Sequence, residues 1–209
     1  MNRWHDFWQY YMSLVLALSS VLLFYYGDRT IALFFAQRPL SAEVDYFFRC
    51  LDILGEPQWY LLPCLGCIVL QQGRNKKIAA AWYYVMLNVL VVSVVAFSMK
   101  WVLGRARPGQ FFFDGTYGFF PDWSHYNASF MSLPSGHAAV IFAFGIAISL
   151  VFPKYGVLAL MFAVLVSSSR LVLTWHYLSD ILAGIACALY CSFAVYKREY
   201  GESDAQRIG

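Results

Sequence analysis

The feature that most constrains this chain is its succession of long apolar runs. Six of them occupy residues 10–26, 57–72, 78–99, 137–152, 155–172 and 177–196. A helix of about 20 residues crosses the hydrocarbon core of a bilayer, which is about 30 Å thick. A helix also satisfies its own backbone hydrogen bonds, as a segment surrounded by lipid must do. We therefore predict an all-α, polytopic membrane protein built as a bundle of six transmembrane helices.

The composition favours the same class of protein. Hydrophobic residues make up 60% of the 209 residues and aromatic residues 19%, whereas about half of a soluble globular protein is apolar. The runs are spread evenly and no linker separates them, so we expect a single domain over residues 1–209. The formal net charge is only +3 and the basic residues lie in short loops, which argues against nucleic acid as a partner.

A segment of mixed character follows the first run. Between residues 27 and 57, apolar side chains recur at helical spacing while charged side chains take the positions between them. This pattern is typical of an amphipathic helix that lies on the membrane surface. The apolar set is Val44, Phe47, Phe48 and Leu51, and the charged set is Glu43, Asp45, Arg49 and Asp52.

Three polar clusters interrupt the apolar pattern later in the chain. His176 and Asp180, in the third cluster, stand four residues apart and would share one face of a helix. The carboxylate can then hold one imidazole nitrogen and leave the other free, which is the arrangement of a nucleophile with its orienting partner. The clusters are, in chain order, Lys100 with Arg107-Pro108, then Pro134-Ser135-Gly136-His137, then Ser169-Arg170 with His176 and Asp180.

Together the three clusters resemble the three-part signature of the type 2 phosphatidic acid phosphatase family. The parts read Lys-x6-Arg-Pro, Pro-Ser-Gly-His and Ser-Arg-x5-His-x3-Asp, and they occur in the family's order between Lys100 and Asp180. Every motif position matches. The four residues of the middle part are a short motif, but the three parts in this order are a specific signal.

The cations of these clusters suit a phosphate group. The transition state of phosphoryl transfer spreads negative charge over three equatorial oxygens, and Lys100, Arg107 and Arg170 can meet that charge without a metal. Arginine engages two oxygens at once through its planar fork. Ser135 and Gly136 come just before the fourth apolar run and add backbone N–H donors at a helix N-terminus. These residues predict phosphoryl transfer at the boundary between lipid and water.

The resemblance implies a hydrolase that forms a covalent phosphohistidine on His176. Asp180 would fix the tautomer of His176 and stabilise the positive charge that develops, and His137 would protonate the departing oxygen as general acid. No metal and no cofactor are expected. The family acts on lipid phosphates, among them undecaprenyl diphosphate, lipid A phosphates, phosphatidylglycerol phosphate and phosphatidic acid; the first two are favoured here.

Simpler interpretations explain single residues but not the set. Cations can snorkel at a bilayer edge and a membrane histidine can serve helix packing, yet neither accounts for three cations beside two histidines. A zinc site would place a dication among Lys100, Arg107 and Arg170, which would repel it. His125 and Asp122, in the long loop before the second cluster, are expected to be solvated loop residues.

Two other functional classes stay open from the sequence. A lipid-to-lipid phosphotransferase would share the first step and pass the phosphoryl group to a second lipid instead of water. A non-enzymatic lipid-binding or channel protein would use a basic vestibule but would not need the pairing of His176 with Asp180. The family's pocket also resembles that of vanadium haloperoxidases, but those proteins are soluble. The oligomeric state is open as well.

The basic residues predict how the bundle is oriented. Six spans put both termini on one side, with eight Lys and Arg residues there and seven on the other side, three of which belong to the motifs. Leaving out those three gives eight against four, so the positive-inside rule places both termini in the cytoplasm. The motif segments then meet at the outer face. The small size and short loops look bacterial, so we expect an inner-membrane protein whose site faces the periplasm.

Overall fold

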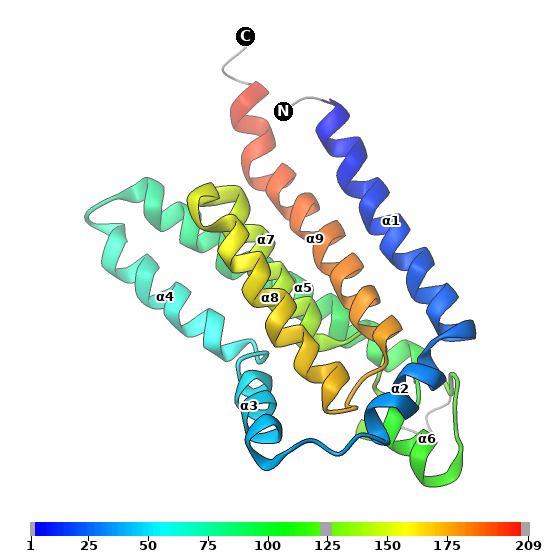
Figure 1. Ribbon diagram of the computed structural model, residues 1–209. Coiled ribbons are helices and arrows are strands. Elements are labelled where there is room, and N and C mark those ends of the chain that lie inside the picture. Colours follow the sequence, from blue (N-terminus) through cyan, green and yellow to red (C-terminus); the bar gives the residue numbers. More distant parts are fainter. Residues whose placement is uncertain (1–2, 122–126, 206–209) are drawn as a thin grey trace.

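The computed structural model describes residues 3–121 and 127–205 of the chain. These residues form a helical bundle (Figure 1), and the predicted all-α class is confirmed. The α-helices are α1 (Arg3–Tyr26), α2 (Asp28–Ala36), α3 (Ala42–Ile53), α4 (Gln58–Gln72), α5 (Lys76–Leu103), α6 (Pro108–Asp114), α7 (Gly136–Val151), α8 (Gly156–Val172) and α9 (Leu178–Ala205). Short 3₁₀ turns cover Ala128–Phe130 and Pro153–Tyr155.

Each of the six apolar runs lies in a helix of its own, namely α1, α4, α5, α7, α8 and α9. Within the described residues, α1, α5, α8 and α9 are each long and apolar enough to cross a membrane. The pair α3 and α4 passes the same test as one span bent by 46°, while α7 is strongly apolar but has 16 residues. The protein is a membrane protein, and the count of six spans stays a prediction.

Helix α7 occupies the centre of the bundle, packed against α5, α8 and α9. Several of its buried positions are small, and Ala139 and Ala143 lie in one buried cluster with Val92 of α5. Small side chains let helices approach closely where lipid supplies no hydrophobic drive for association. The buried amide of Asn88 connects α5 to both neighbouring helices. Its nitrogen donates to the Ala143 carbonyl of α7 and to Ser192 Oγ of α9, each at 2.9 Å.

The ends of α5 are fixed by specific residues. The Asn75 side chain caps the start by accepting from the N–H groups of Lys77 and Ile78, at 3.1 and 3.2 Å. The helix ends at Gly104, whose φ of +56° is the left-handed conformation that glycine tolerates best. A Cβ at Gly104 would lie 2.1 Å from the carbonyl oxygen of Phe120. This position therefore needs glycine for two reasons.

The segments between the long helices hold more structure than the sequence suggested. The amphipathic helix predicted between residues 27 and 57 is present as α3, which Ser41 caps through its hydroxyl; its location at a membrane surface stays a prediction. Helix α2 and helix α6 were not predicted. Helix α6 lies within the long loop that was predicted before the second cluster.

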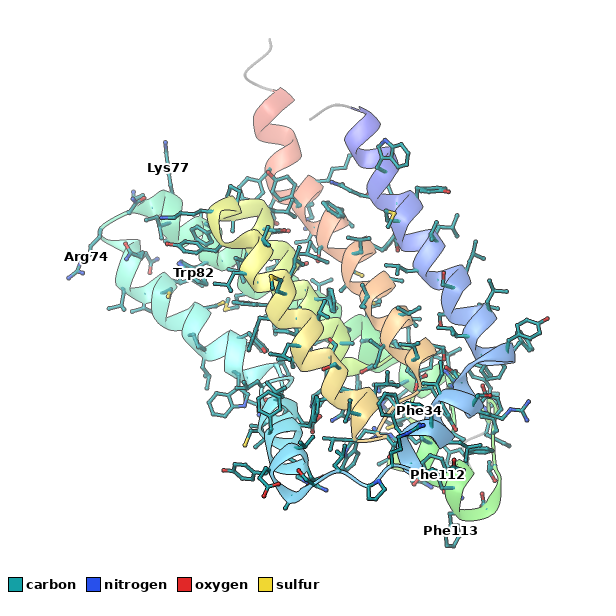
Figure 2. The ribbon with its side chains drawn as sticks, viewed as in Figure 1. Phe34, Arg74, Lys77, Trp82, Phe112 and Phe113 are labelled. Carbon is teal, nitrogen blue, oxygen red and sulfur yellow. The ribbon has the colours of Figure 1, made fainter. Side chains whose placement is uncertain are left out.

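The two ends of the bundle differ in the chain segments that they hold. Figure 1 shows α2, α3 and α6 at one end, and both ends of the chain together with the α4–α5 turn at the other. Figure 2 shows the side chains of Arg74 and Lys77 at the end with the termini, and those of Phe34, Phe112 and Phe113 at the opposite end. The last turn of α5, and with it Lys100, leads into the end that carries α6.

Candidate active site

The structure brings all the predicted site residues together at the end of the bundle that holds α6. They come from four long helices and the segments that join them, and their charges lie close enough to act on one another. The residues are Lys100 in the last turn of α5, Arg107 just before α6, Ser135, Gly136 and His137 at the start of α7, Arg170 in the last turn of α8, His176 in the α8–α9 segment, and Asp180 in the first turn of α9.

His176 and Asp180 meet, although they do not share a helix face as predicted, because His176 precedes α9, which begins at Leu178. Nδ1 of His176 lies 3.4 Å from Oδ2 of Asp180, and both side chains are buried. The backbone N–H of Tyr177 donates to the same carboxylate oxygen at 2.9 Å. With its proton on Nδ1, the imidazole presents an unprotonated Nε2 on its far side, as a nucleophilic nitrogen must.

Ser132 is a member of this group that the sequence did not single out. Its hydroxyl donates to Oδ2 of Asp180 at 2.6 Å and lies 3.4 Å from Nδ1 of His176. The residue is fully buried. Its backbone N–H donates to the Arg105 carbonyl at 3.0 Å. This bond connects the segment that leads into the second motif with the segment that leads into Arg107. A serine two residues before Pro134 carries no signal of this role in the sequence.

The surroundings of His176 keep its imidazole neutral. Burial lowers its pKa well below the usual value for histidine, and the nearby positive charges of Lys100, Arg170 and Arg107 lower it further. Both effects disfavour the imidazolium form. A neutral ring has the free electron pair that attack on phosphorus requires.

The three cations converge on a small volume beside the start of α7. Nζ of Lys100 donates to the Met131 carbonyl at 2.8 Å and to the Ser132 carbonyl at 3.4 Å, and Nη2 of Arg107 reaches the same Met131 carbonyl at 3.5 Å. Nε of Arg107 and Nε of Arg170 are buried and have no hydrogen-bond partner among the described residues. Such N–H groups are left to bind an anion.

Arg170 has two further neighbours that orient its guanidinium. It forms an ion pair with Asp52 at the end of α3, and its Cζ lies 5.5 Å from the ring centroid of Trp175. The backbone N–H groups of Trp175 and His176 both donate to the Arg170 carbonyl, at 3.0 and 3.1 Å. The same residue therefore shapes the segment that carries His176.

The start of α7 supplies N–H donors and His137. The Ser135 hydroxyl caps the helix by accepting from the Ala138 N–H at 3.4 Å, and the Ser135 N–H donates to the Asp180 carbonyl at 2.9 Å. The first-turn N–H groups that remain have no partner within the helix and favour an anion. A Cβ on Gly136 would lie 3.5 Å from Cε of Lys100, so this helix end lies against the cation.

His137 faces a cavity of about 420 Å³ that is mostly apolar. Lys100 and Gly136 line the cavity beside His137, and Val94 and Phe97 of α5 line it farther along the helix. Both of these α5 side chains are exposed on the outside of the bundle, where lipid would surround a membrane protein. The cavity thus extends from the site residues Lys100 and His137 to side chains on the outer surface of the bundle.

Arg105 and Asp28 are two buried charges that the sequence did not single out. Each has only 1% of its surface exposed. They form an ion pair, with Nη2 of Arg105 2.6 Å from Oδ2 of Asp28. Arg105 also pairs with Asp180. A buried charge costs free energy unless it is paired, and their partners lie too far along the chain for the sequence to reveal them.

Two sequence predictions cannot be placed in this site. His125 and Asp122, expected to be solvated loop residues, lie outside the described residues. Among the residues that are described, no group of three or more His, Cys, Asp or Glu side chains is arranged to hold a metal ion.

Comparison with solved structures identifies a relative with the same fold. The chain aligns with the crystal structure of a transmembrane PAP2 type phosphatidylglycerolphosphate phosphatase from Bacillus subtilis at a TM-score of 0.58 and 17% identity. The alignment covers 91% of this chain and 97% of that one. At this identity the likeness concerns the arrangement of the helices.

Comparison of the sequence identifies relatives and a family. Lipid A 1-phosphatase of Rhizobium etli is 31% identical over 165 residues, which are 72% of this chain and 68% of that protein. Undecaprenyl-diphosphatase of Sulfolobus acidocaldarius is 30% identical over 121 residues, which are 57% of this chain and 54% of that protein. The PAP2 superfamily matches residues 78–203, the stretch that holds all three motifs. The chain belongs to the PAP2 superfamily.

Proposed function

We propose that this protein, a lipid phosphatase, moves a phosphoryl group from a membrane lipid to Nε2 of His176 and then to water. The observation that carries the proposal is a buried His176 that is paired with Asp180 and whose pKa is lowered by burial and by three nearby cations. Few structural roles would require such a costly cluster of charges at a bilayer edge. Perturbed ionisable groups in a cleft are typical of catalytic sites.

The reaction divides into two displacements at phosphorus. In the first, the Nε2 electron pair forms a P–N bond, the P–O bond to the lipid breaks, and His137 gives its proton to the departing oxygen. In the second, a water molecule passes a proton to His137 while its oxygen bonds to phosphorus, and the P–N bond returns its electrons to Nε2. Inorganic phosphate leaves, and both histidines regain their starting protonation states.

The remaining residues stabilise charge during both displacements. Lys100, Arg107 and Arg170 bind the equatorial oxygens of phosphorus, and the Gly136 N–H adds to them at the start of α7, whereas the predicted Ser135 N–H donates to the Asp180 carbonyl instead. Asp180 stabilises the positive charge that builds on His176 as the P–N bond forms. These groups are in place before the substrate arrives, so little reorganisation is needed in the transition state.

The cavity beside His137 points to a lipid as the leaving group. In-line displacement places the departing oxygen opposite Nε2, on the side where a general acid must lie. We assign this part to His137, which lines a cavity whose other walls are mainly apolar. The names of the relatives favour a lipid A phosphate or a polyprenyl diphosphate such as undecaprenyl diphosphate, and phosphatidylglycerol phosphate fits the same chemistry. We place the protein in a bacterial inner membrane with this site on the periplasmic side.

Release of inorganic phosphate from a panel of lipid phosphates tests this function. The purified protein is incubated with lipid A 1-phosphate, undecaprenyl diphosphate, phosphatidylglycerol phosphate and phosphatidic acid, with no second lipid as acceptor. We expect release from at least one substrate and none from His176→Ala. A phosphorylated second lipid formed without release of inorganic phosphate would indicate the phosphotransferase, and equal release by His176→Ala would overturn the proposal.

A further inference from the structure

The buried Arg105 links the site to helix α2, which lies outside the region matched by the PAP2 superfamily. Nη2 of Arg105 binds Oδ2 of Asp28 at 2.6 Å, and Nη1 binds Ser179 Oγ at 2.6 Å and Oδ1 of Asp180. Asp28 in turn accepts from the Ser179 N–H at 3.1 Å and from the Ser179 hydroxyl. All four residues are buried. Arg105 is therefore held on one side by α2 and on the other by the first turn of α9.

The two oxygens of Asp180 have separate partners. Oδ1 is taken by Arg105, whereas Oδ2 accepts from Ser132 and from the Tyr177 N–H and faces Nδ1 of His176. The two oxygens of a carboxylate are equivalent, so what these partners can fix is the plane of the group, which otherwise turns about its last bond. Because a guanidinium holds Oδ1 and is itself held by a second carboxylate, the plane is fixed with the other oxygen toward the histidine.

The surroundings of the Arg105 guanidinium fix its orientation as well. Its Cζ lies 4.7 Å from the ring centroid of Tyr177 and 4.9 Å from that of Phe24. Aromatic faces at these distances attract a cation. The guanidinium is therefore confined between two carboxylates and two rings, with almost no contact with solvent. A buried ion-pair network seldom adds stability beyond what apolar side chains would give. Its effect here is to fix the orientation of the Arg105 guanidinium and of the carboxylates that it binds.

We propose that Arg105, held in place by Asp28, is a positioning residue that directs the Asp180 carboxylate toward His176. The inference rests on the proposed function, because it assigns Arg105 an effect on the nucleophile and not on the substrate. Arg105 itself does not touch the reacting atoms. The N-terminal segment thus takes part in catalysis through Asp28.

Kinetics of Arg105→Gln give the first test. Outer partners of catalytic groups typically change activity by about 10–100-fold, and we expect a fall in kcat of that size. Inhibition by inorganic phosphate should be unchanged, because the three cations that would bind it are intact. Arg38→Gln is the matched control and should leave kcat unchanged, since Arg38 is exposed and comes just after α2, at the same end of the bundle. An Arg105→Gln protein with normal kcat would overturn the inference.

A double-mutant cycle separates positioning from general damage to the structure. If Arg105 acts through Asp180, then Arg105→Gln should cost about twofold or less once Asp180→Asn is already present, because coupled residues are not additive. Equal losses in the two backgrounds would indicate a purely structural role and would refute the inference. Should Arg105→Gln fail to elute as a monodisperse species in detergent, the cycle is run with Asp28→Asn, for which we expect the same non-additivity with a smaller loss.

The inference and the proposed function can fail separately. If His176→Ala keeps its activity, the function itself is wrong, whatever Arg105 does. If His176→Ala is inactive while both Arg105→Gln and Asp28→Asn are as active as the wild type, only the positioning role is lost.

Discussion

At the scale of single residues, the two histidines should respond differently to the leaving group. His137 matters only to the extent that the departing oxygen needs a proton, which an alkoxide does and a nitrophenolate with a pKa of about 7 hardly does. We expect His137→Ala to lose most activity on an alkyl phosphate but to keep much of it on an aryl phosphate. His176→Ala should lose both activities by several orders of magnitude, as removal of a nucleophile does.

The measurement is kcat/KM for each variant on both substrates, with folding checked by monodisperse elution in detergent. Rescue of His176→Ala by the good leaving group, together with an inactive His137→Ala, would show that the two roles are reversed.

The pH dependence should report the low pKa of His176. Burial and the neighbouring cations lower this pKa, so the ring loses its proton at a lower pH than an ordinary histidine, and the nucleophile stays available as the medium becomes acidic. We therefore expect the acid limb of kcat/KM to lie below the usual histidine value of about 6.5. The profile is measured on two phosphate esters with different second ionisations, since a phosphate itself titrates near 6.

An acid limb that stays in place when the ester is changed belongs to the enzyme. Such a limb at or above the ordinary histidine value would contradict the environment described for His176.

The residues that the sequence revealed and those that it hid differ in one physical respect. Lys100, His137 and His176 stand in short motifs whose spacing is visible along the chain. The partners that orient the site residues are far from them in the sequence: Asp52 binds Arg170, and Ser132 binds Asp180. Contacts across such separations depend on how the helices pack, and apolar periodicity shows which face of a helix is buried but not which residue it meets.

At the scale of elements, the turn between α3 and α4 lies directly on His137. A Cβ on Gly55 would approach Cδ2 of His137 to 2.2 Å and Cβ of His137 to 2.8 Å. Gly55→Ala should therefore displace the imidazole and reduce kcat on an alkyl phosphate by about 10-fold or more, since small misplacements of reacting groups are costly. On an aryl phosphate the loss should be smaller.

Gly66→Ala is the matched control for this prediction. Gly66 also lies in this part of the chain, within α4, and a Cβ there would meet nothing within 4 Å. We expect wild-type kcat for Gly66→Ala and comparable melting temperatures for the two variants. Equal effects of the two substitutions would show that the contact with His137 does not matter.

Sequence reasoning was strongest for the long helices and weakest for the segments between them. Apolar length is a direct physical signal of a membrane helix, and each of the six runs is helical. Helix α6 is short, and its fold depends on tertiary hydrogen bonds of the preceding residues. The Ala106 N–H donates to the Gly118 carbonyl at 3.1 Å, and the Arg107 N–H donates to the Ser129 carbonyl at 2.8 Å. No local sequence pattern predicts such hydrogen bonds.

At the scale of the whole molecule, the orientation of the bundle can be tested by labelling. Figure 2 shows Phe113 at the end opposite Arg74. In a Cys50→Ser background, which removes the exposed cysteine, we expect Phe113→Cys to react with an impermeant thiol reagent in cells stripped of any outer membrane. Gly73→Cys should react only after permeabilisation. The reverse pattern would place the site in the cytoplasm.

The pairing of site arginines with acidic residues from the N-terminal part has a consequence for building chimeras. Asp28 and Asp52 both precede residue 78, where the family match begins, and they neutralise Arg105 and Arg170 respectively. A hybrid that joins residues 78–209 to the N-terminal helices of another superfamily member would keep every motif residue. It would nevertheless lack the carboxylate that pairs with Arg170 and one of the two that pair with Arg105, unless the donor helices placed carboxylates at the same two points. A chimera should therefore take the segments that carry Asp28 and Asp52 from the same protein as the segments that carry Arg105 and Arg170.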